Sequence, residues 1–316
     1  MLPEDERVAV GPGDDAAVLR LTGGELAVTT DMMVEGVDFF PGEDPRRLGR
    51  RALAVNLSDL AAMGAHPEFF LLSIGFPPEK GDDFPLEVAR GALTRARPFG
   101  ASLVGGDLSG APAIVVSVAL WGRPSGRPLL RSGGREGDFL FVSGWPGRAE
   151  AGRRLAAGSF PAGALAIEHE RELLAAYHDP EPRVALGLAL AREGLASAAI
   201  DVSDGVGLDA GRLARASGAK AVIELGEIPI SPALAEAARG KGEDPVEWAL
   251  SGGDDYELLF SAPPSALARL TAGGPDWNVP VTRIGRLEPG AGAVAIGPSG
   301  ERDIAASGWN HLGRRA

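Results

Sequence analysis

The chain has 316 residues, of which 45% are hydrophobic, and a formal net charge of −12 at pH 7. This length is sufficient for two domains of ordinary size. The acidic balance excludes the basic surface that a nucleic-acid partner requires, and no stretch approaches the roughly 18 consecutive apolar residues of a membrane span.

The residue types available for chemistry are restricted. The absence of Cys excludes disulfides, thiolate zinc sites and cysteine nucleophiles, and the four His residues show no metal-ligand spacing. Lys80, Lys220 and Lys241 are the only lysines, and none lies in a phosphate-binding P-loop. Residues 1–6 are acidic, unlike a secretory signal, which predicts a cytoplasmic protein. Any chemistry must therefore depend on oxygen ligands and Arg.

Acidic and hydroxyl side chains mark the first predicted strands. A glycine-rich turn with two adjacent acids precedes a predicted strand, and a second strand, predicted at 26–31, ends in two threonines and an aspartate. Each feature alone is an ordinary turn or strand end. The polar residues at these two places are Asp14, Asp15, Thr29, Thr30 and Asp31.

The segment between Asp44 and Gly64 is predicted to form one long helix, because Asp44 is a favourable N-cap and Pro45 suits the first turn. Its first half is expected to direct four arginines to water: Arg46, Arg47, Arg50 and Arg51. From residue 52 onward its only polar residues are Asn56, Ser58 and Asp59. A buried carboxylate costs several kcal/mol unless a cation accompanies it, so Asp59 indicates a metal site. The alternative is that Asp59 caps a second, shorter helix.

The rest of the chain alternates strands with helices and contains one clear break. Residues 123–128, rich in Pro and Gly, are the best boundary and predict domains at 1–124 and 125–316. The alternation predicts a two-domain α/β (α+β) fold. Before the break we expect a buried strand at 69–76, strands at 102–104 and 113–121, and a helix at 86–96; after it we expect strands at 139–143, 198–200 and 281–287, and helices at 149–157, 168–177, 183–193 and 208–216.

Aspartates recur at strand ends and in glycine-rich turns along the whole chain. Converging carboxylates with no Lys nearby are typical of sites for hard divalent cations and favour Mg²⁺. A triphosphate donor and a phosphate acceptor about 4 Å apart repel by roughly 1 kcal/mol per charge pair in water, and several Mg²⁺ ions would offset that repulsion. An anionic acceptor then needs no catalytic base. The aspartates are Asp14, Asp15, Asp31, Asp59, Asp107, Asp201, Asp204, Asp254 and Asp255.

Six segments, in order and spanning nearly the whole chain, carry a resemblance to a known family. They are Gly-Asp-Asp-Ala-Ala at 13–17, Thr-Thr-Asp at 29–31, Asn-Leu-Ser-Asp-Leu-Ala-Ala-Met-Gly at 56–64, Gly-Gly-Asp at 105–107, Asp-Val-Ser-Asp-Gly at 201–205 and Ser-Gly-Gly-Asp-Asp-Tyr-Glu-Leu at 251–258. Together they resemble the thiamine-monophosphate kinase family of the aminoimidazole-ribonucleotide-synthetase-like superfamily. The resemblance implies direct, ATP-dependent phosphorylation of thiamine monophosphate to thiamine diphosphate, the last step of its biosynthesis. It also implies a homodimer formed through the N-terminal sheet, and a C-terminal α/β domain that closes the nucleotide cleft.

The resemblance further implies roles for individual residues. The implied Mg²⁺ ligands are Asp15, Thr29, Thr30, Asp31, Asp59, Asp107, Asp201 and Asp204, among which Asp31, Asp59 and Asp204 are the expected catalytic residues. The implied ATP-binding residues are Gly106, Asp107, Arg131 and Ser203, and the implied substrate-binding residues are Asp38, Asp254 and Trp309. Two positions depart from the family pattern: Asp38 stands where His is frequent, and Asp254 stands where Glu can occur.

Other interpretations stay open at this point. Another superfamily member is one alternative, although the absence of Cys disfavours the selenophosphate synthetase and hydrogenase-maturation relatives. An acidic Mg²⁺- or nucleotide-binding protein without turnover is another. Among single residues, Arg131 fits an exposed loop and Trp309 a packing anchor, while Tyr256 and Phe260 are assigned to the core of a strand and His66 to a solvated helix end.

Overall fold

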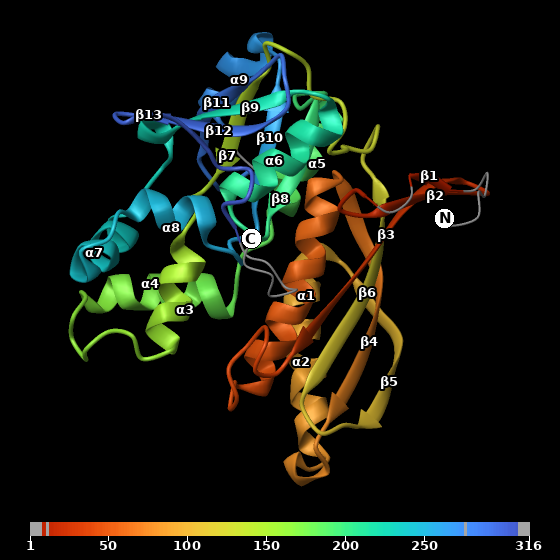
Figure 1. Ribbon diagram of the computed structural model, residues 1–316. Coiled ribbons are helices and arrows are strands. Elements are labelled where there is room, and N and C mark those ends of the chain that lie inside the picture. The colour runs from red at the N-terminus through yellow and green to blue at the C-terminus, as the bar shows by residue number, and fades with distance from the viewer. Residues whose placement is uncertain (1–7, 11–12, 275–276, 309–316) are drawn as a thin grey trace.

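The computed structural model describes residues 8–10, 13–274 and 277–308. Two β-sheets, one from the N-terminal and one from the C-terminal part of the chain, form its frame (Figure 1). In the six-stranded first sheet, neighbouring strands are antiparallel except for the parallel pair β4–β5. Its order is β1-β2-β3-β6-β4-β5, with β1 (Val8–Val10), β2 (Ala17–Leu21), β3 (Gly24–Val34), β4 (Ala65–Phe76), β5 (Ser102–Gly110) and β6 (Val115–Pro124).

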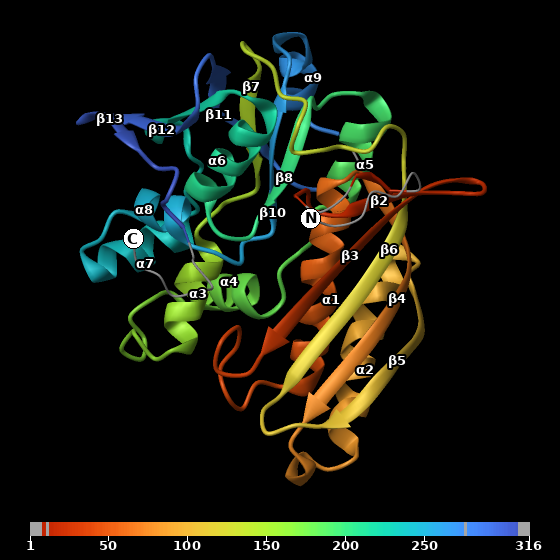
Figure 2. The same ribbon diagram turned by 45° about the vertical axis from the view of Figure 1, so that its right-hand side comes forward.

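Two helices cover one face of this sheet (Figure 2): α1 (Pro45–Ala62) and α2 (Asp83–Ala96). The Asp44 side chain caps α1 by accepting a hydrogen bond from the Arg47 backbone N–H (2.9 Å), so the predicted single long helix is confirmed. The helices approach closely because α1 has Gly at the crossing. A Cβ on Gly49 would lie 1.9 Å from the carbonyl oxygen of Val88.

The C-terminal part combines a seven-stranded sheet with seven α-helices among the described residues. The sheet is antiparallel except for the parallel pair β9–β12, and its order is β13-β12-β9-β11-β7-β10-β8. Its strands are β7 (Phe139–Ser143), β8 (Ala198–Val202), β9 (Lys220–Glu224), β10 (Glu257–Ala262), β11 (Val281–Glu288), β12 (Gly292–Gly297) and β13 (Gly300–Asp303). The helices are α3 (Arg148–Ala156), α4 (Ile167–His178), α5 (Val184–Glu193), α6 (Val206–Ser217), α7 (Pro232–Lys241), α8 (Pro245–Ser251) and α9 (Leu267–Ala272).

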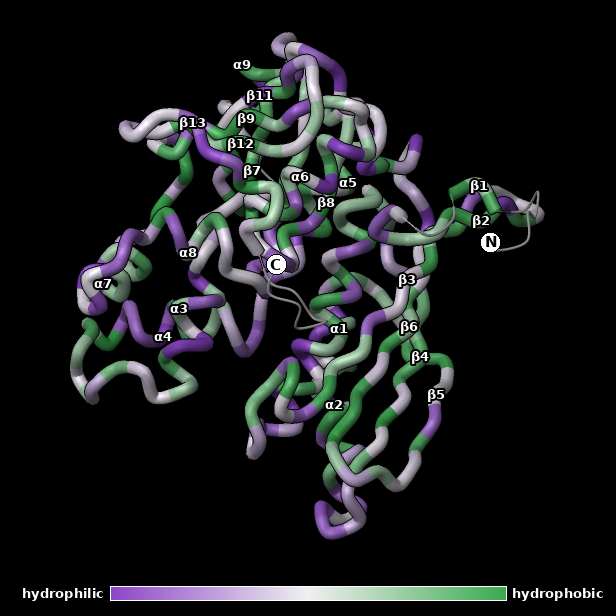
Figure 3. The backbone as a smooth tube through the Cα atoms, viewed as in Figure 1, coloured by the Kyte–Doolittle hydropathy of each residue, from purple (hydrophilic) through white to green (hydrophobic). Residues whose placement is uncertain are grey.

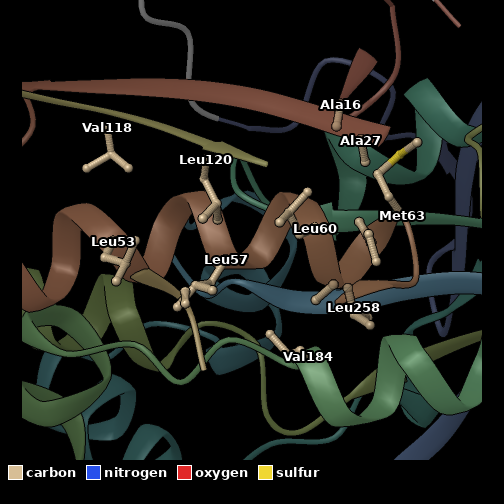
Figure 4. Packing of buried hydrophobic residues seen from close by; sticks show 14 of the residues in the cluster. Ala16, Ala27, Leu53, Leu57, Leu60, Met63, Val118, Leu120, Val184 and Leu258 are labelled. Atoms are coloured by element: carbon tan, nitrogen blue, oxygen red, sulfur yellow. The ribbon is translucent and has the colours of Figure 1, made fainter. Parts of the chain in front are cut away.

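The apolar half of α1 lies at the centre of the molecule. Its side chains pack against β6 on one side and against α5 and β10 on the other (Figure 4). Figure 3 shows the hydrophobic residues that follow β4 and β6 along the same sheet. Each fully buried Leu stabilises the fold by about 1.5–3 kcal/mol, so α1 is held firmly on both sides. The residues concerned are Leu53, Leu57, Leu60 and Met63 of α1, Val118 and Leu120 of β6, Val184 of α5 and Leu258 of β10.

β4 is not the fully buried strand that the sequence predicts at 69–76. Phe70 and Leu72 are buried under the helices, whereas Phe69 and Leu71 are 41% and 37% exposed. Alternate residues of a strand point to opposite faces, so the helices cover one face of the sheet and leave the other open. The continuous apolar run hid this alternation.

Other predicted elements are present with shifted ends. His66, predicted to end a helix, lies in β4 instead, because residues 65–67 already pair with β6. The strand predicted at 26–31 extends over the whole of β3, and the helix predicted from residue 208 begins at Val206. Within the described part of the chain, no helix combines the length and the apolar character needed to cross a bilayer.

Candidate functional site

A cavity of about 400 Å³ lies where α1 meets the end of β3, the end of β8 and the loop that precedes β10. Its lining divides into two parts, which we name the acidic end and the aromatic end. The acidic end comprises Asp15, Thr29, Thr30, Asp31, Asp59, Arg131, Asp201, Ser203 and Asp204. The aromatic end comprises Phe40, Arg51, Tyr177, Asp254 and Tyr256.

Three carboxylates converge in the acidic end. Oxygen atoms of Asp15, Asp59 and Asp201 lie within 4.8 Å of one another. Thr29 Oγ1 donates to Asp59 Oδ2 (2.5 Å), and Ser58 Oγ donates to Asp201 Oδ2 (2.8 Å). The alternative that Asp59 caps a second helix is wrong, since α1 continues unbroken past it. Asp59 is instead held by its helix between β3 and β8.

Asn56 explains how β3 is fixed beside α1. It is fully buried, and its Oδ1 accepts the backbone N–H of Asp31 (3.0 Å) while its Nδ2 donates to the Ala52 carbonyl (2.9 Å). The adjacent Thr30 donates its hydroxyl to the Val118 carbonyl of β6 (2.9 Å). These bonds satisfy the buried polar groups and set the position of Asp31 relative to Asp59.

Arg131 is the cation of the acidic end. Its Nε and Nη2 donate to the two carboxylate oxygens of Asp15 (3.0 and 2.9 Å), a bidentate geometry. Its backbone N–H donates to Asp14 (3.0 Å), so Asp14 anchors the loop instead of lining the cavity. The interpretation of Arg131 as an exposed loop residue is therefore wrong.

Asp204 lies at the start of α6 and is oriented by two neighbours. Arg212 Nη1 lies 2.6 Å from Asp204 Oδ2 and 2.7 Å from Asp209 Oδ1. The fully buried Asp209 accepts the backbone N–H of Asp204 (3.0 Å), and burial raises the pKa of Asp209 to about 7. The carboxylate of Asp204 consequently reaches the cavity from a fixed backbone.

The acidic end is electrostatically unfavourable when it contains only protein groups. Burial, followed by repulsion from Asp201, Asp31 and Asp15, raises the pKa of Asp59 well above the usual carboxyl value. Burial and repulsion from Asp15 raise the pKa of Asp201 in the same way. Clustered hard oxygen donors of this kind fit Mg²⁺, whose charge would offset the repulsion.

We expect Mg²⁺ to raise the melting temperature more at pH 8 than at pH 5. The folded-state pKa values of Asp59 and Asp201 exceed their unfolded values. The stability of the metal-free protein therefore falls as the pH rises from the unfolded-state pKa values toward the folded-state ones. Mg²⁺ binding to the ionised carboxylates reverses the loss, by on the order of 5 °C at saturation. Differential scanning fluorimetry in EDTA and in Mg²⁺, with NaCl at matched ionic strength as the control, measures the difference. An Mg²⁺ effect no larger than that of NaCl at every pH contradicts the prediction.

Two residues of the aromatic end correct their predictions. Arg51, predicted to face water, is only 3% exposed, and its Nη2 donates to Asp254 Oδ2 (2.8 Å). Tyr256, predicted inside a core strand, lies before β10 with a φ of 52° and donates its hydroxyl to Asp254 Oδ1 (3.0 Å). The sequence also gave no indication of Phe40 and Tyr177, whose rings are 6.1 Å apart at this end. Asp254 bonds to both Arg51 and Tyr256, and Tyr177 lies against the Arg51 guanidinium.

Gly106 and Asp107 do not reach the cavity of their own chain. Both lie in the edge strand β5 and are exposed. Gly106 has a packing role, because a Cβ there would lie 1.8 Å from the Leu72 carbonyl oxygen of β4. Neither residue is among those that line the cavity, so their predicted contacts with ATP and Mg²⁺ stay predictions.

The remaining predicted residues have mixed positions. Asp38 lines the cavity, but its Oδ2 accepts the Val34 N–H (2.7 Å) and closes the turn after β3. Asp255 points away and accepts backbone N–H groups at the start of α3, and burial raises its pKa to about 7. Trp309 lies outside the described residues.

Comparison with known proteins identifies the family. The chain matches the AIR synthase related protein, N-terminal domain, over residues 13–123 and the AIR synthase related protein, C-terminal domain, over residues 153–297. It is 38% identical to the thiamine-monophosphate kinase of Rhodopirellula baltica over 293 residues, covering 89% of this chain and 84% of that protein. The chain belongs to the thiamine-monophosphate kinase family. The thiamine-monophosphate kinase of Escherichia coli is 38% identical over 284 residues, with the same coverage of 89% and 84%.

Solved structures confirm the thiamine-monophosphate kinase fold. AaThiL complexed with AMPPCP and TMP superposes with a TM-score of 0.85 and 31% identity, covering 95% of this chain and 91% of that chain. The thiamine-monophosphate kinase of Stenotrophomonas maltophilia gives 0.76 and 35%, covering 92% of each. Escherichia coli HypE, a hydrogenase maturation protein, gives 0.71 at 22% identity over 88% of this chain and 84% of that chain, which shows a shared fold alone.

Proposed function

We propose that this protein transfers a phosphoryl group from ATP to thiamine monophosphate, producing thiamine diphosphate in the last step of its biosynthesis. The observation that carries the proposal is the acidic end, where three carboxylates and Arg131 converge at one side of a cavity whose other side is aromatic. Membership of the kinase family supports it, as does the likeness to AaThiL, whose structure contains AMPPCP and TMP.

The acidic end supplies the proposed Mg²⁺ ligands. Bound Mg²⁺ ions would neutralise the two facing phosphate groups and spread the charge of an in-line transfer. The hydroxyl donors and the helix that carries Asp59 keep the carboxylates in place before substrates bind. The proposed ligands within the chain are Asp15, Thr29, Thr30, Asp31, Asp59, Asp201 and Asp204. Among them, Asp31, Asp59 and Asp204 are the proposed catalytic residues.

Other residues bind and orient the two substrates. We assign Arg131 and Ser203 to the nucleotide, because Arg131 is a fixed cation beside the carboxylates and Ser203 lines the same wall. We assign Asp254 to the organic part of the acceptor. Asp38 and Trp309 are assigned to substrate binding by family resemblance alone. A phosphate monoester has a second pKa of about 6 and is already anionic at neutral pH, so no general base is required.

The chain is proposed to act as two domains. Residues 1–124 bind ATP and Mg²⁺ and form the dimer, and residues 125–316 close the cavity. The cavity lies between the two parts, which meet through the hydrogen bond from Ser58 to Asp201, and the second part contributes Arg131, Asp201, Ser203 and Asp204 to its lining. ATP is a cytoplasmic metabolite, and we propose a cytoplasmic location for the enzyme.

We also propose a homodimer, because Asp107 cannot complete the site of its own chain. The sheet register places Asp31 beside Val118, Val118 beside Leu72, and Leu72 beside Gly106. Three strand spacings of about 4.8 Å therefore separate β3 from β5 by about 14 Å. This is too far for Asp31 and Asp107 of one chain to share a Mg²⁺ ion, whose ligands lie at about 2.1 Å.

The free edges of the first sheet suggest how a second copy would bind. β2 pairs with β3 only as far as Val28, so among the described strands β6 alone pairs with residues 29–34. The N–H groups of Asp31 and Val34 are bonded to the side chains of Asn56 and Asp38. Among the described strands, β5 pairs only with β4. Unpaired edges are templates for further strands. Placing β5 of the partner subunit beside residues 29–34 would bring Asp107 of the partner subunit near Asp31 and would cover the exposed side chains of Met32, Phe69, Leu71, Val104 and Leu108.

Phosphorus NMR of the purified protein with ATP, Mg²⁺ and thiamine monophosphate tests the proposed function. We expect the acceptor resonance to be replaced by the two coupled resonances of thiamine diphosphate, in step with formation of ADP. A reaction with EDTA and one with unphosphorylated thiamine are the controls, and neither should give thiamine diphosphate. Release of inorganic phosphate without thiamine diphosphate, or no change, contradicts the proposal.

A further inference from the structure

The first two turns of α3 form one wall of the cavity, lined by Glu150 and Arg153. Arg153 donates from Nε and Nη2 to the two carboxylate oxygens of Glu150 (2.7 and 3.0 Å), and 41% of its side chain is exposed. The bond to Glu150 raises the pKa of Arg153, and Tyr177 and Asp254 are close enough to add to this effect. This wall therefore borders the aromatic end.

The start of α3 is capped by a residue distant in sequence. The N-cap position holds Gly147, which has no side chain to accept the free N–H groups of the first turn. Asp255 supplies the acceptors instead: its Oδ2 accepts the backbone N–H of Gly147 (2.5 Å), and its Oδ1 accepts that of Ala149 (3.0 Å). Both bonds are buried, so removing the carboxylate leaves the N–H groups without a replacement partner.

Asp255 stands between two residues that line the cavity. Asp254 and Tyr256 have φ values of 68° and 52°, which non-glycine residues rarely adopt. Their backbone N–H groups bond to the Ser203 and Val202 carbonyls (2.8 Å each) at the end of β8. A strained backbone of this kind persists only where its surroundings fix it. The bonds to β8 hold one side of the loop, and the Asp255 side chain holds the other side against α3.

The loop and α3 also meet directly. A Cβ on Gly252 would lie 2.7 Å from the Cβ of Glu150, so the two segments approach as closely as glycine permits. The side-chain hydrogen bonds of Asp255 to described residues go to the start of α3 alone. The carboxylates of the acidic end are positioned by other groups, the hydroxyls of Thr29 and Ser58 and the guanidinium of Arg212. The two ends of the cavity are thus held by separate sets of bonds.

We propose that Asp255 is a positioning residue for acceptor binding, which couples the loop of Asp254 and Tyr256 to α3 and so fixes two walls of the aromatic end. Its own side chain does not line the cavity, so it acts through these neighbours and not by contact with the acceptor. Binding of nucleotide and Mg²⁺ at the acidic end should not depend on it. The inference rests on the proposed function and extends it to the residue that sets the affinity for thiamine monophosphate.

Calorimetry of Asp255→Asn and Asp255→Ala tests the inference. Asn keeps one acceptor oxygen for the two N–H groups and Ala keeps none. The affinity for thiamine monophosphate in Mg²⁺ should therefore fall about 10-fold in the first variant and further in the second. The affinity for the ATP analogue AMPPCP should stay that of wild-type protein. In the kinase assay, KM for thiamine monophosphate should rise, with KM for ATP and kcat at saturating acceptor unchanged.

Asp138→Asn is the matched control. Asp138 is also buried and also accepts a backbone N–H, that of Arg135 (3.0 Å), but it lies in the turn before β7 and does not line the cavity. Its replacement should lower the melting temperature and leave both affinities unchanged. If the Asp255 variants weaken both ligands equally, bind both as wild-type protein does, or do not fold, Asp255 has no separate role in acceptor binding and the inference is wrong. If wild-type protein itself neither binds nor phosphorylates thiamine monophosphate, it is the proposed function that fails.

Discussion

Replacing Asp59 by Asn should abolish thiamine diphosphate formation while leaving the protein folded. The carboxylate lies within 4.8 Å of those of Asp15 and Asp201, so its charge is needed by any shared Mg²⁺ ion. Losing several kcal/mol of charge stabilisation corresponds to a decrease in kcat on the order of 10³-fold or more. The metal-free variant should melt no lower than wild-type protein, because Asn removes a carboxyl group that is unfavourable when ionised. Burial and the neighbouring aspartates raise the pKa of that carboxyl group.

Asp44→Asn is the control for this experiment. It makes the same chemical change on the same helix, but at the N-cap, where Asn serves as well as Asp. Its turnover and melting temperature should match those of wild-type protein. Full activity of Asp59→Asn would show that Asp59 only supports α1. Unfolding of the variant would indicate that Asp59 has a structural role. Circular dichroism and steady-state kinetics of the three proteins separate these outcomes.

The acidic end could be predicted from the sequence because its signals are local. Asp59 interrupts an apolar helical run, where a carboxylate needs a special reason. Asp201 near a strand end and Asp15 in a glycine-rich turn are ordinary by themselves and gain weight because such aspartates recur along the chain. The same reasoning gave the long helix and the alternation of strands and helices. These features depend on periodicity and capping, which short segments carry by themselves.

The aromatic end could not be predicted because its residues depend on contacts between distant segments. Arg51 follows three other arginines on α1 and shares their local pattern, and only Asp254, about 200 residues later, makes it a buried residue. Tyr256 fits a strand by pattern but is diverted by the backbone bonds of its loop. Tertiary partners of this kind override local propensity, and a single sequence does not reveal them.

The same limit applies to β4 and β5. A strand made of consecutive apolar residues can have both of its faces buried within one chain. Alternatively, the chain buries one face and a partner buries the other. In the single chain, Phe69 and Leu71 are exposed on the face that the helices leave open. The family resemblance implies that Asp107 is a metal ligand, and the sheet register, which separates it from Asp31 of the same chain, supports our proposal that another copy supplies it.

A heterodimer of Asp59→Asn and Asp107→Asn subunits should recover about half of the wild-type activity, although each variant alone is inactive. In a twofold dimer each proposed site takes Asp59 from one subunit and Asp107 from the other. One site of the heterodimer then contains both substitutions and the other contains neither. Co-expression with two different affinity tags and sequential purification gives the heterodimer, and the kinase assay measures its activity.

A heterodimer of Asp59→Asn and Asp31→Asn subunits provides the matched control. Asp31 and Asp59 line the same cavity of one chain, so every site in that heterodimer lacks one of them and activity should stay absent. Inactivity of the Asp59→Asn/Asp107→Asn heterodimer would place Asp107 in its own subunit's site, against the separation of about 14 Å that the sheet register imposes. A monomeric protein in analytical ultracentrifugation, or a fully active Asp107→Asn homodimer, would equally remove the need for a shared site. Recovery in the first heterodimer alone requires that Asp107 of the partner subunit completes the acidic end of the other chain.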